Sequence, residues 1–119
     1  MIGFVSPTLR AIIHLRVRGE VEEELELVVD TGFTGFLALT HDEITRLQLP
    51  FMIETPATLA DGNDIVTKLF AARVEFDGEW RDVEVLEANG GALIGMALLE
   101  NCSLQIEVRD GGRVLVEAL

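Results

Sequence analysis

The acid at position 30 is the side chain whose setting best suits chemistry. Asp30 follows the aliphatic run Leu27 to Val29 and is followed by Thr31 and Gly32. A carboxylate at the point where a strand leaves the core carries a desolvation cost unless neighbouring groups donate hydrogen bonds to it. Glycines at positions 32 and 35 let the backbone turn sharply and bring amide N–H groups close to the carboxylate. The segment therefore predicts a tight loop built around Asp30.

The Asp-Thr-Gly order suits the hydrolysis of peptide bonds by carboxylates. Two aspartates that share a water cannot both ionise cheaply, so one keeps a proton and the other acts as a base. The Thr31 hydroxyl can lock the surrounding loops, and Gly32 leaves room for the water and a substrate carbonyl. The chain contains one such tripeptide, so the second Asp30 is expected from another copy of the chain across a two-fold axis. In the competing interpretation, Asp30 and Gly32 only form an ordinary turn.

Two hairpins are expected on either side of this loop. Apolar and polar residues alternate from Leu9 to Val29, with a turn at Gly19-Glu20, which predicts a hairpin that leads into Asp30. Residues 55–76 predict a second hairpin that turns near Asp61-Gly62. From the residues alone, this second hairpin is equally well a plain part of a barrel or a peptide-binding arm.

A helix and a short strand complete the expected surroundings of the loop. Thr40 and Glu43 have the spacing of a capping box, which predicts a short helix that ends before Pro50. The segment Leu93-Ile94-Gly95 is expected to be a strand beneath the Asp30 loop, where glycine permits a close backbone approach. Met96 to Asn101 is expected to form one or two helical turns.

The bulk composition predicts one globular domain over residues 1–119. The chain is 49% apolar and carries a net charge of −12, which disfavours nucleic acid and anionic membranes as partners. We expect no membrane span and no targeting signal, because long apolar runs are missing and Met1 to Pro7 lacks a basic start. The single cysteine, Cys102, cannot form an internal disulfide, which favours the cytoplasm. With only His14 and His41, no metal site is expected, and no organic cofactor is implied.

Three elements in this order resemble the retropepsin-like aspartic peptidases, the family of the retroviral proteases. They are the Asp30-Thr31-Gly32 loop, the hairpin at Thr58 to Gly62, and Leu93-Ile94-Gly95. The resemblance is strongest to small bacterial and cyanobacterial clan AA proteases and covers nearly the whole chain. It implies a mostly β fold, a closed antiparallel β-barrel of the retropepsin (acid protease) type with one or two short helices.

The resemblance also implies a function, that of a homodimeric aspartic endopeptidase whose two Asp30 carboxylates activate water. Its catalytic loop would be Asp30, Thr31 and Gly32, with the Thr31 hydroxyls bonded across the two-fold axis. A flap from each subunit would close over an extended peptide or protein substrate, and the chain termini would interleave between subunits. The residues expected to contact substrate are Leu59, Ala60, Asp61, Gly62, Leu93 and Ile94.

The chain departs from the retroviral members at one pair of positions. Those enzymes usually have an acid shortly after Asp-Thr-Gly and an arginine after the later glycine, whereas this chain has Phe33-Thr34-Gly35 and Met96. Both partners are replaced together, which avoids an unpaired buried charge. Two alternatives stay open: a non-catalytic dimeric peptide-binding or scaffolding module with the same fold, and an unrelated β-rich antitoxin-like or regulatory protein, which the acidic charge suggests.

Overall fold

Strands dominate the structure, as the alternating sequence pattern predicts. The computed structural model describes residues 1–58 and 61–119. The described residues form one helix, α1 (His41–Leu47), and ten strands: β1 (Ile2–Val5), β2 (Ala11–Arg18), β3 (Glu22–Val29), β4 (Leu37–Leu39), β5 (Phe51–Thr58), β6 (Asp64–Phe76), β7 (Glu79–Glu87), β8 (Leu93–Ile94), β9 (Cys102–Ile106) and β10 (Arg113–Ala118).

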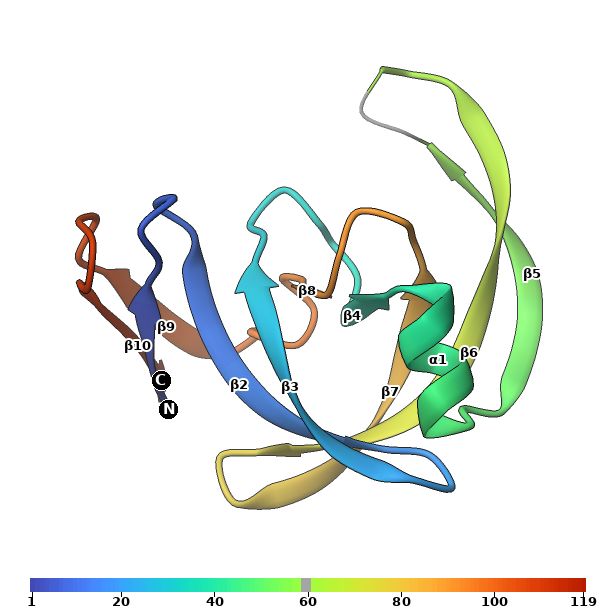
Figure 1. Cartoon of the computed structure of the whole chain (residues 1–119), viewed down its shortest axis with the longest axis horizontal. Helices are drawn as coiled ribbons and strands as arrows, with labels where there is room; N and C mark the ends of the chain where they lie inside the picture. The colour runs from blue at the N-terminus through green and yellow to red at the C-terminus, as the bar shows by residue number, and fades with distance from the viewer. Residues whose placement is uncertain (59–60) are drawn as a thin grey trace.

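The strands form one sheet that closes on itself (Figure 1). Its order is β5-β6-β7-β4-β8-β3-β2-β1-β10-β9, and an additional pairing of β6 with β2 closes the six strands β2, β3, β8, β4, β7 and β6 into a barrel. At this closure Arg18 pairs with Arg73, and the Arg18 guanidinium lies 4.4 Å from the centroid of the Trp80 ring. The expected closed barrel is confirmed.

Two pairings differ from the expected antiparallel arrangement. β3 runs parallel to β8, and β4 runs parallel to β7, while β8 and β4 are antiparallel. These parallel contacts join segments that are far apart in the sequence, so no local turn signals them. They matter for the site, because β8 lies directly beside the end of β3, where Asp30 follows.

The first hairpin forms in the register that its alternation predicts. β2 and β3 pair from Ile12 and Val28 to Arg18 and Glu22. The inward side chains are buried and belong to the core, among them Ile13, Leu15, Val17, Leu25 and Leu27. The outward face carries opposite charges, and the side chains of Arg16 and Glu22 approach to 3.6 Å.

The capping box at the start of α1 is confirmed. The Thr40 amide donates to the Glu43 carboxylate at 2.9 Å, and the Glu43 amide donates to the Thr40 hydroxyl at 3.3 Å. Ile44 and Leu47 are buried. The helix ends before Pro50, at Gln48, whose φ of 54° is left-handed.

The second helix expected at Met96 to Asn101 does not form. This segment is a run of turns, in which the Leu99 amide donates to the Met96 carbonyl and the Cys102 amide donates to the Leu99 carbonyl. The left-handed Asn101, with φ 64°, then redirects the chain into β9. The apolar spacing of Leu98 and Leu99 reflects their burial in the core rather than a helix.

Both ends of the chain lie in the sheet. β10 pairs with β9 and with β1, and the amino group of Met1 donates to the Val116 carbonyl at 2.7 Å. The sequence did not predict β1, whose four residues are too short for a clear alternation. Among the described residues the one helix, α1, has seven residues and is far too short to cross a membrane.

Candidate active site

Asp30 lies one residue beyond β3, where its backbone is fixed by β8. Its amide donates to the Ile94 carbonyl at 2.9 Å, and the Val28 amide donates to the Ala92 carbonyl at 3.0 Å. These bonds continue the parallel ladder in which Val29 pairs with Ile94. The position of the Asp30 side chain therefore depends on β8 as much as on its own strand.

The loop after Asp30 turns back on the carboxylate. The Gly32 amide donates to Asp30 Oδ1 at 2.9 Å, and the Phe33 amide donates to the Asp30 carbonyl at 3.1 Å. Asp30 is partly exposed, while Thr31 and Gly32 are exposed. The carboxylate is thus held by the loop and is still open to a second group, as the sequence pattern predicts.

The backbone after β8 crosses directly under the Asp30 loop. The Gly95 amide donates to the Phe36 carbonyl at 2.9 Å, and the Met96 amide donates to the Phe33 carbonyl at 2.8 Å. A Cβ atom at position 95 would collide with the carbonyl oxygen of Gly35 and would lie 2.7 Å from the Phe33 ring. The expected close approach at Gly95 is therefore present, and only glycine fits there.

The Phe33 ring fills the space between Gly35 and Gly95. Its ring lies over Gly95, and a Cβ atom at Gly35 would come within 2.6 Å of it. Met96, directly after Gly95, is 45% exposed. An apolar ring packed between two glycines therefore fills this space without burying charge.

The β5–β6 hairpin stands over the same side of the barrel as the Asp30 loop (Figure 1). Its turn is shaped by Gly62, with φ 87°, and by the Asn63 amide, which donates to Asp61 Oδ1 at 3.0 Å. Asp61 and Gly62 are exposed on this hairpin. Leu59 and Ala60, also expected to contact substrate, lie outside the described residues.

Leu93 and Ile94 differ in their access to the site. Ile94 is fully buried, and its side chain belongs to the core. A bound peptide cannot contact this side chain, so Ile94 serves the site through the carbonyl that accepts the Asp30 amide. Leu93 is only partly buried. The sequence could not separate the two roles, because both residues are aliphatic and adjacent.

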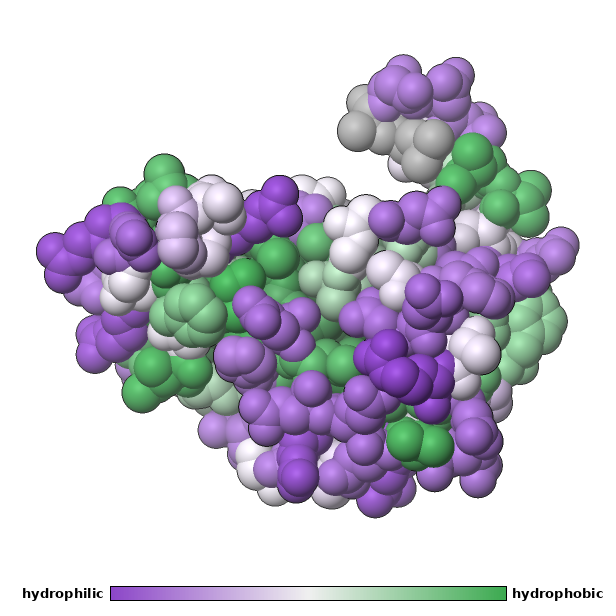
Figure 2. All heavy atoms as spheres, viewed as in Figure 1, coloured by the Kyte–Doolittle hydropathy of each residue, from purple (hydrophilic) through white to green (hydrophobic). Residues whose placement is uncertain are grey.

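Two cavities border the loop and the hairpin. One, of about 590 Å³, lies between the hairpin and residues 86–90. The other, of about 340 Å³, is lined by Thr31 with aliphatic residues that include Val29, Leu9 and Val108. Figure 2 shows the hairpin standing clear of the rest of the surface, with hydrophobic atoms exposed below its grey residues. Both cavities are open to a ligand or to a partner chain.

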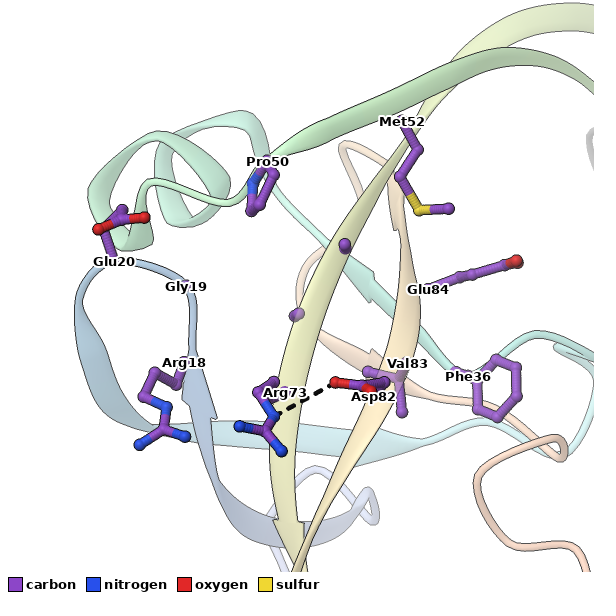
Figure 3. Close-up of a pocket in the computed structure, with 12 residues that line it drawn as sticks. Arg18, Gly19, Glu20, Phe36, Pro50, Met52, Arg73, Asp82, Val83 and Glu84 are labelled. Atoms are coloured by element: carbon purple, nitrogen blue, oxygen red, sulfur yellow. Dashed lines mark ion pairs between the residues drawn. The ribbon is translucent and has the colours of Figure 1, made fainter.

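A third hollow, of about 480 Å³, lies among residues of β2, β5, β6 and β7 (Figure 3). Phe36, Pro50 and Met52 supply its apolar lining, and an ion pair between Arg73 and Asp82 lies at its edge, with a nitrogen–oxygen distance of 3.2 Å. Residues 30–35 do not line this hollow, and Phe36 is the one residue of the loop between β3 and β4 that does. We therefore assign the candidate active site to the Asp30 loop and the hairpin above it.

The sequence matches no protein-family model and no curated protein. The fold, in contrast, is similar to that of several solved structures, among them two proteases. A retropepsin-like aspartic protease from Rickettsia conorii matches with a TM-score of 0.65 and 19% identity, over 99% of this chain and 92% of that one. EIAV protease, complexed with the inhibitor HBY-793, matches with a TM-score of 0.59 and 17% identity, over 76% of this chain and 86% of that one. The chain therefore has a retropepsin-like fold.

Proposed function

We propose that the protein is an aspartic endopeptidase that acts as a homodimer. One observation carries the proposal: Asp30 is fixed by β8 and by Gly32 and stays partly exposed, in a loop on the side of the barrel over which the β5–β6 hairpin stands. The retropepsin-like fold supports it, since the similar structures are aspartic proteases.

In the proposed reaction, two subunits each contribute one Asp30. The two carboxylates share one proton, because like charges at such close range cannot both ionise cheaply. The ionised carboxylate takes a proton from a water, and the protonated one donates to the carbonyl oxygen of the scissile bond. The intermediate is a neutral gem-diol, and no acyl-enzyme forms. The exposed Thr31 hydroxyl and the small Gly32 leave space for the partner loop and the water.

The substrate of this reaction is a peptide in an extended conformation. Its backbone would pair with the β5–β6 hairpin as an added strand, on one side, and face the Asp30 loop on the other. Asp61, Gly62 and Leu93 have side chains or backbone groups that are exposed or partly exposed for such contacts. Leu59 and Ala60 belong to this proposal by sequence alone.

Exposed apolar surface beside the loop supports a second copy of the chain at this place. The cavity next to Thr31 is lined mainly by aliphatic residues, and two of them, Leu9 and Val108, are 59% and 72% exposed. Apolar surface of this kind on a single chain favours an interface. Its position beside the loop that needs a second Asp30 supports a two-fold partner there.

One observation favours the non-catalytic alternative, a dimeric peptide-binding module. Asp30 Oδ1 accepts the Gly32 amide, so the carboxylate also has a structural task that would keep an aspartate here without catalysis. In that case the hairpin and the loop would still bind an extended peptide, and Asp30 would only shape the turn.

Cleavage of a diverse peptide library from acidic to neutral pH tests the two functions. The wild type is compared with Asp30→Asn, and the oligomeric state of each sample is recorded by sedimentation. Cleavage by a wild-type dimer that vanishes in a dimeric variant supports the peptidase. A dimer that binds peptides equally well in both forms and cleaves none supports the binding module, and a monomer at all concentrations removes the shared pair of carboxylates.

A further inference from the structure

Thr67 is the one buried polar side chain of the described residues, with 8% of its surface exposed. It lies on β6, in the part of that strand that forms the hairpin. Its hydroxyl donates to the Glu87 carbonyl, at the end of β7, with an oxygen–oxygen distance of 2.7 Å. A buried hydroxyl of this kind is bonded because an unpaired one would be costly to desolvate.

This bond lies where the hairpin leaves the barrel. The β6–β7 ladder has its terminal pair at Leu69 and Leu86, and Leu69 follows Thr67 by two residues in the sequence. Beyond that pair β7 runs beside β4, with Glu87 opposite Leu39, while β6 continues with β5 alone. The hydrogen bond of the Thr67 side chain thus connects β6 and β7 just beyond the last backbone pair of their ladder.

Among the described residues of the hairpin beyond Thr67, apolar side chains are largely exposed rather than packed on the barrel. Ile65 is 41% exposed and Val66 is 70% exposed. The cavity of about 590 Å³ separates this part of the hairpin from residues 86–90, and Thr67 lies in its wall. Because protein atoms do not fill the space between the hairpin and residues 86–90, a single hydrogen bond contributes much to the position of the hairpin.

Glu87 connects this bond to the catalytic loop. The chain runs from Glu87 through residues 88–92 into β8, and the carbonyls of Ala92 and Ile94 in this segment accept the Val28 and Asp30 amides. Glu87 is itself held, because its carboxylate lies 2.8 Å from His41 Nδ1, at the start of α1. The hairpin and the Asp30 loop are therefore tied to one continuous segment.

We propose that Thr67 is a positioning residue that sets the place of the β5–β6 hairpin over the Asp30 loop through its bond to the Glu87 carbonyl. Its importance for turnover rests on the proposed peptidase function. Its effect on the hairpin does not, and can be measured without a substrate.

The test compares Thr67→Val with Thr67→Ser and with Thr55→Val. Valine keeps the shape of threonine and removes the hydroxyl, and serine keeps the hydroxyl. Thr55 is the matched control, since it pairs with Thr67 across the hairpin and makes no bond to β7 among the described contacts. Amide hydrogen exchange is followed over residues 53–58 and 61–67, and over β2 and β3 as a reference.

We expect Thr67→Val to speed exchange in the hairpin by about fivefold to tenfold, the effect of losing one hydrogen bond, with β2 and β3 unchanged. With a cleaved peptide, KM should rise by about fivefold while kcat changes less than twofold, since the hairpin holds substrate and transition state alike. In Thr67→Ser and in Thr55→Val, the hairpin exchange rate and KM should both stay close to the wild-type values.

Several results would overturn the proposal. Hairpin exchange in Thr67→Val that equals that in Thr55→Val would do so, as would faster exchange spread evenly over β2 and β3, which marks a general loss of stability. If hairpin exchange in Thr67→Ser were as fast as in Thr67→Val, the loss of the hydroxyl could not be the cause of the faster exchange. If the wild type cleaves no peptide, the peptidase proposal fails, while the exchange comparison still decides the role of Thr67.

Discussion

The Asp30 amide donates a 2.9 Å hydrogen bond to the Ile94 carbonyl, and this bond joins the candidate catalytic loop to β8. The side chain of Ile94 is fully buried in the core. One residue thus fixes the loop through its backbone and is itself fixed by packing. The placement of Asp30 therefore depends on the core of the barrel as well as on its own turn.

Truncation of Ile94 should destabilise the whole fold. Ile94→Ala leaves a cavity in a packed core, and we expect a loss of about 2–5 kcal/mol in the free energy of unfolding. Leu93→Ala removes a partly exposed side chain and should lose about 1–2 kcal/mol. Urea unfolding of both variants measures the difference. Equal losses would mean that Ile94 is not the packed anchor of β8.

A side chain at Gly95 should distort the crossing beneath the loop. Gly95→Ala places a Cβ atom against the Gly35 carbonyl, and overpacking of this kind destabilises proteins by about 1–3 kcal/mol. Gly90→Ala is the control, since nothing lies within 4 Å of a Cβ atom there, and it should change stability by less than about 0.5 kcal/mol. Thermal unfolding measures the stability of both variants. A Gly95→Ala variant as stable as the wild type would contradict the close backbone contact at this crossing.

Two substitutions at Asp30 should separate its structural and chemical tasks. Asparagine keeps an oxygen that can accept the Gly32 amide, so Asp30→Asn should unfold within about 0.5 kcal/mol of the wild type. Asp30→Ala loses that bond and about 1 kcal/mol of stability. Both should lower kcat for peptide cleavage by about 10³-fold or more. Cleavage retained by either variant would exclude Asp30 as the catalytic acid or base.

Mixing subunits should reveal a shared active site. If each site needs one Asp30 from each of two chains, wild type exchanged with an equal amount of Asp30→Asn should lose about half of its activity, because mixed dimers are inactive. The activity is measured after dilution and reconcentration, which allow subunits to exchange. Activity that stays constant under complete exchange would show that one chain is sufficient, and the same mixture with Gly90→Ala controls for dilution.

Local features of the fold were predictable from the sequence, and distant pairings were not. The β2–β3 hairpin and the Thr40–Glu43 capping box each depend on residues close in the sequence, so alternation and spacing indicated them. The parallel contact of β3 with β8 joins distant segments, and the sequence predicted only a strand near the Asp30 loop, without this pairing. The turns at Met96 to Asn101 were mistaken for a helix, because buried Leu98 and Leu99 have the same spacing in either conformation.

The candidate site shows the same division. The Asp30 loop and Gly95 carry their signal in residue type, since an acid directly after an apolar strand and a glycine after two aliphatic residues both stand out in the sequence. Thr67 carries none, because an exposed and a buried threonine look alike in a β-strand. Its role emerges only where the ends of β6 and β7 diverge, which is a property of the assembled barrel.

The stacking of Arg18 on Trp80 makes the fluorescence of this tryptophan sensitive to the β2–β6 pairing that closes the barrel. Trp80 is the only tryptophan of the chain, and the cation above its ring comes from β2, which closes the barrel against β6. Separation of β2 from β6 would remove the guanidinium from the indole ring and expose the ring to water. The emission spectrum of Trp80 would then change even if the β2–β3 hairpin stayed intact. Fluorescence can therefore time the closing of the barrel during refolding without any added dye.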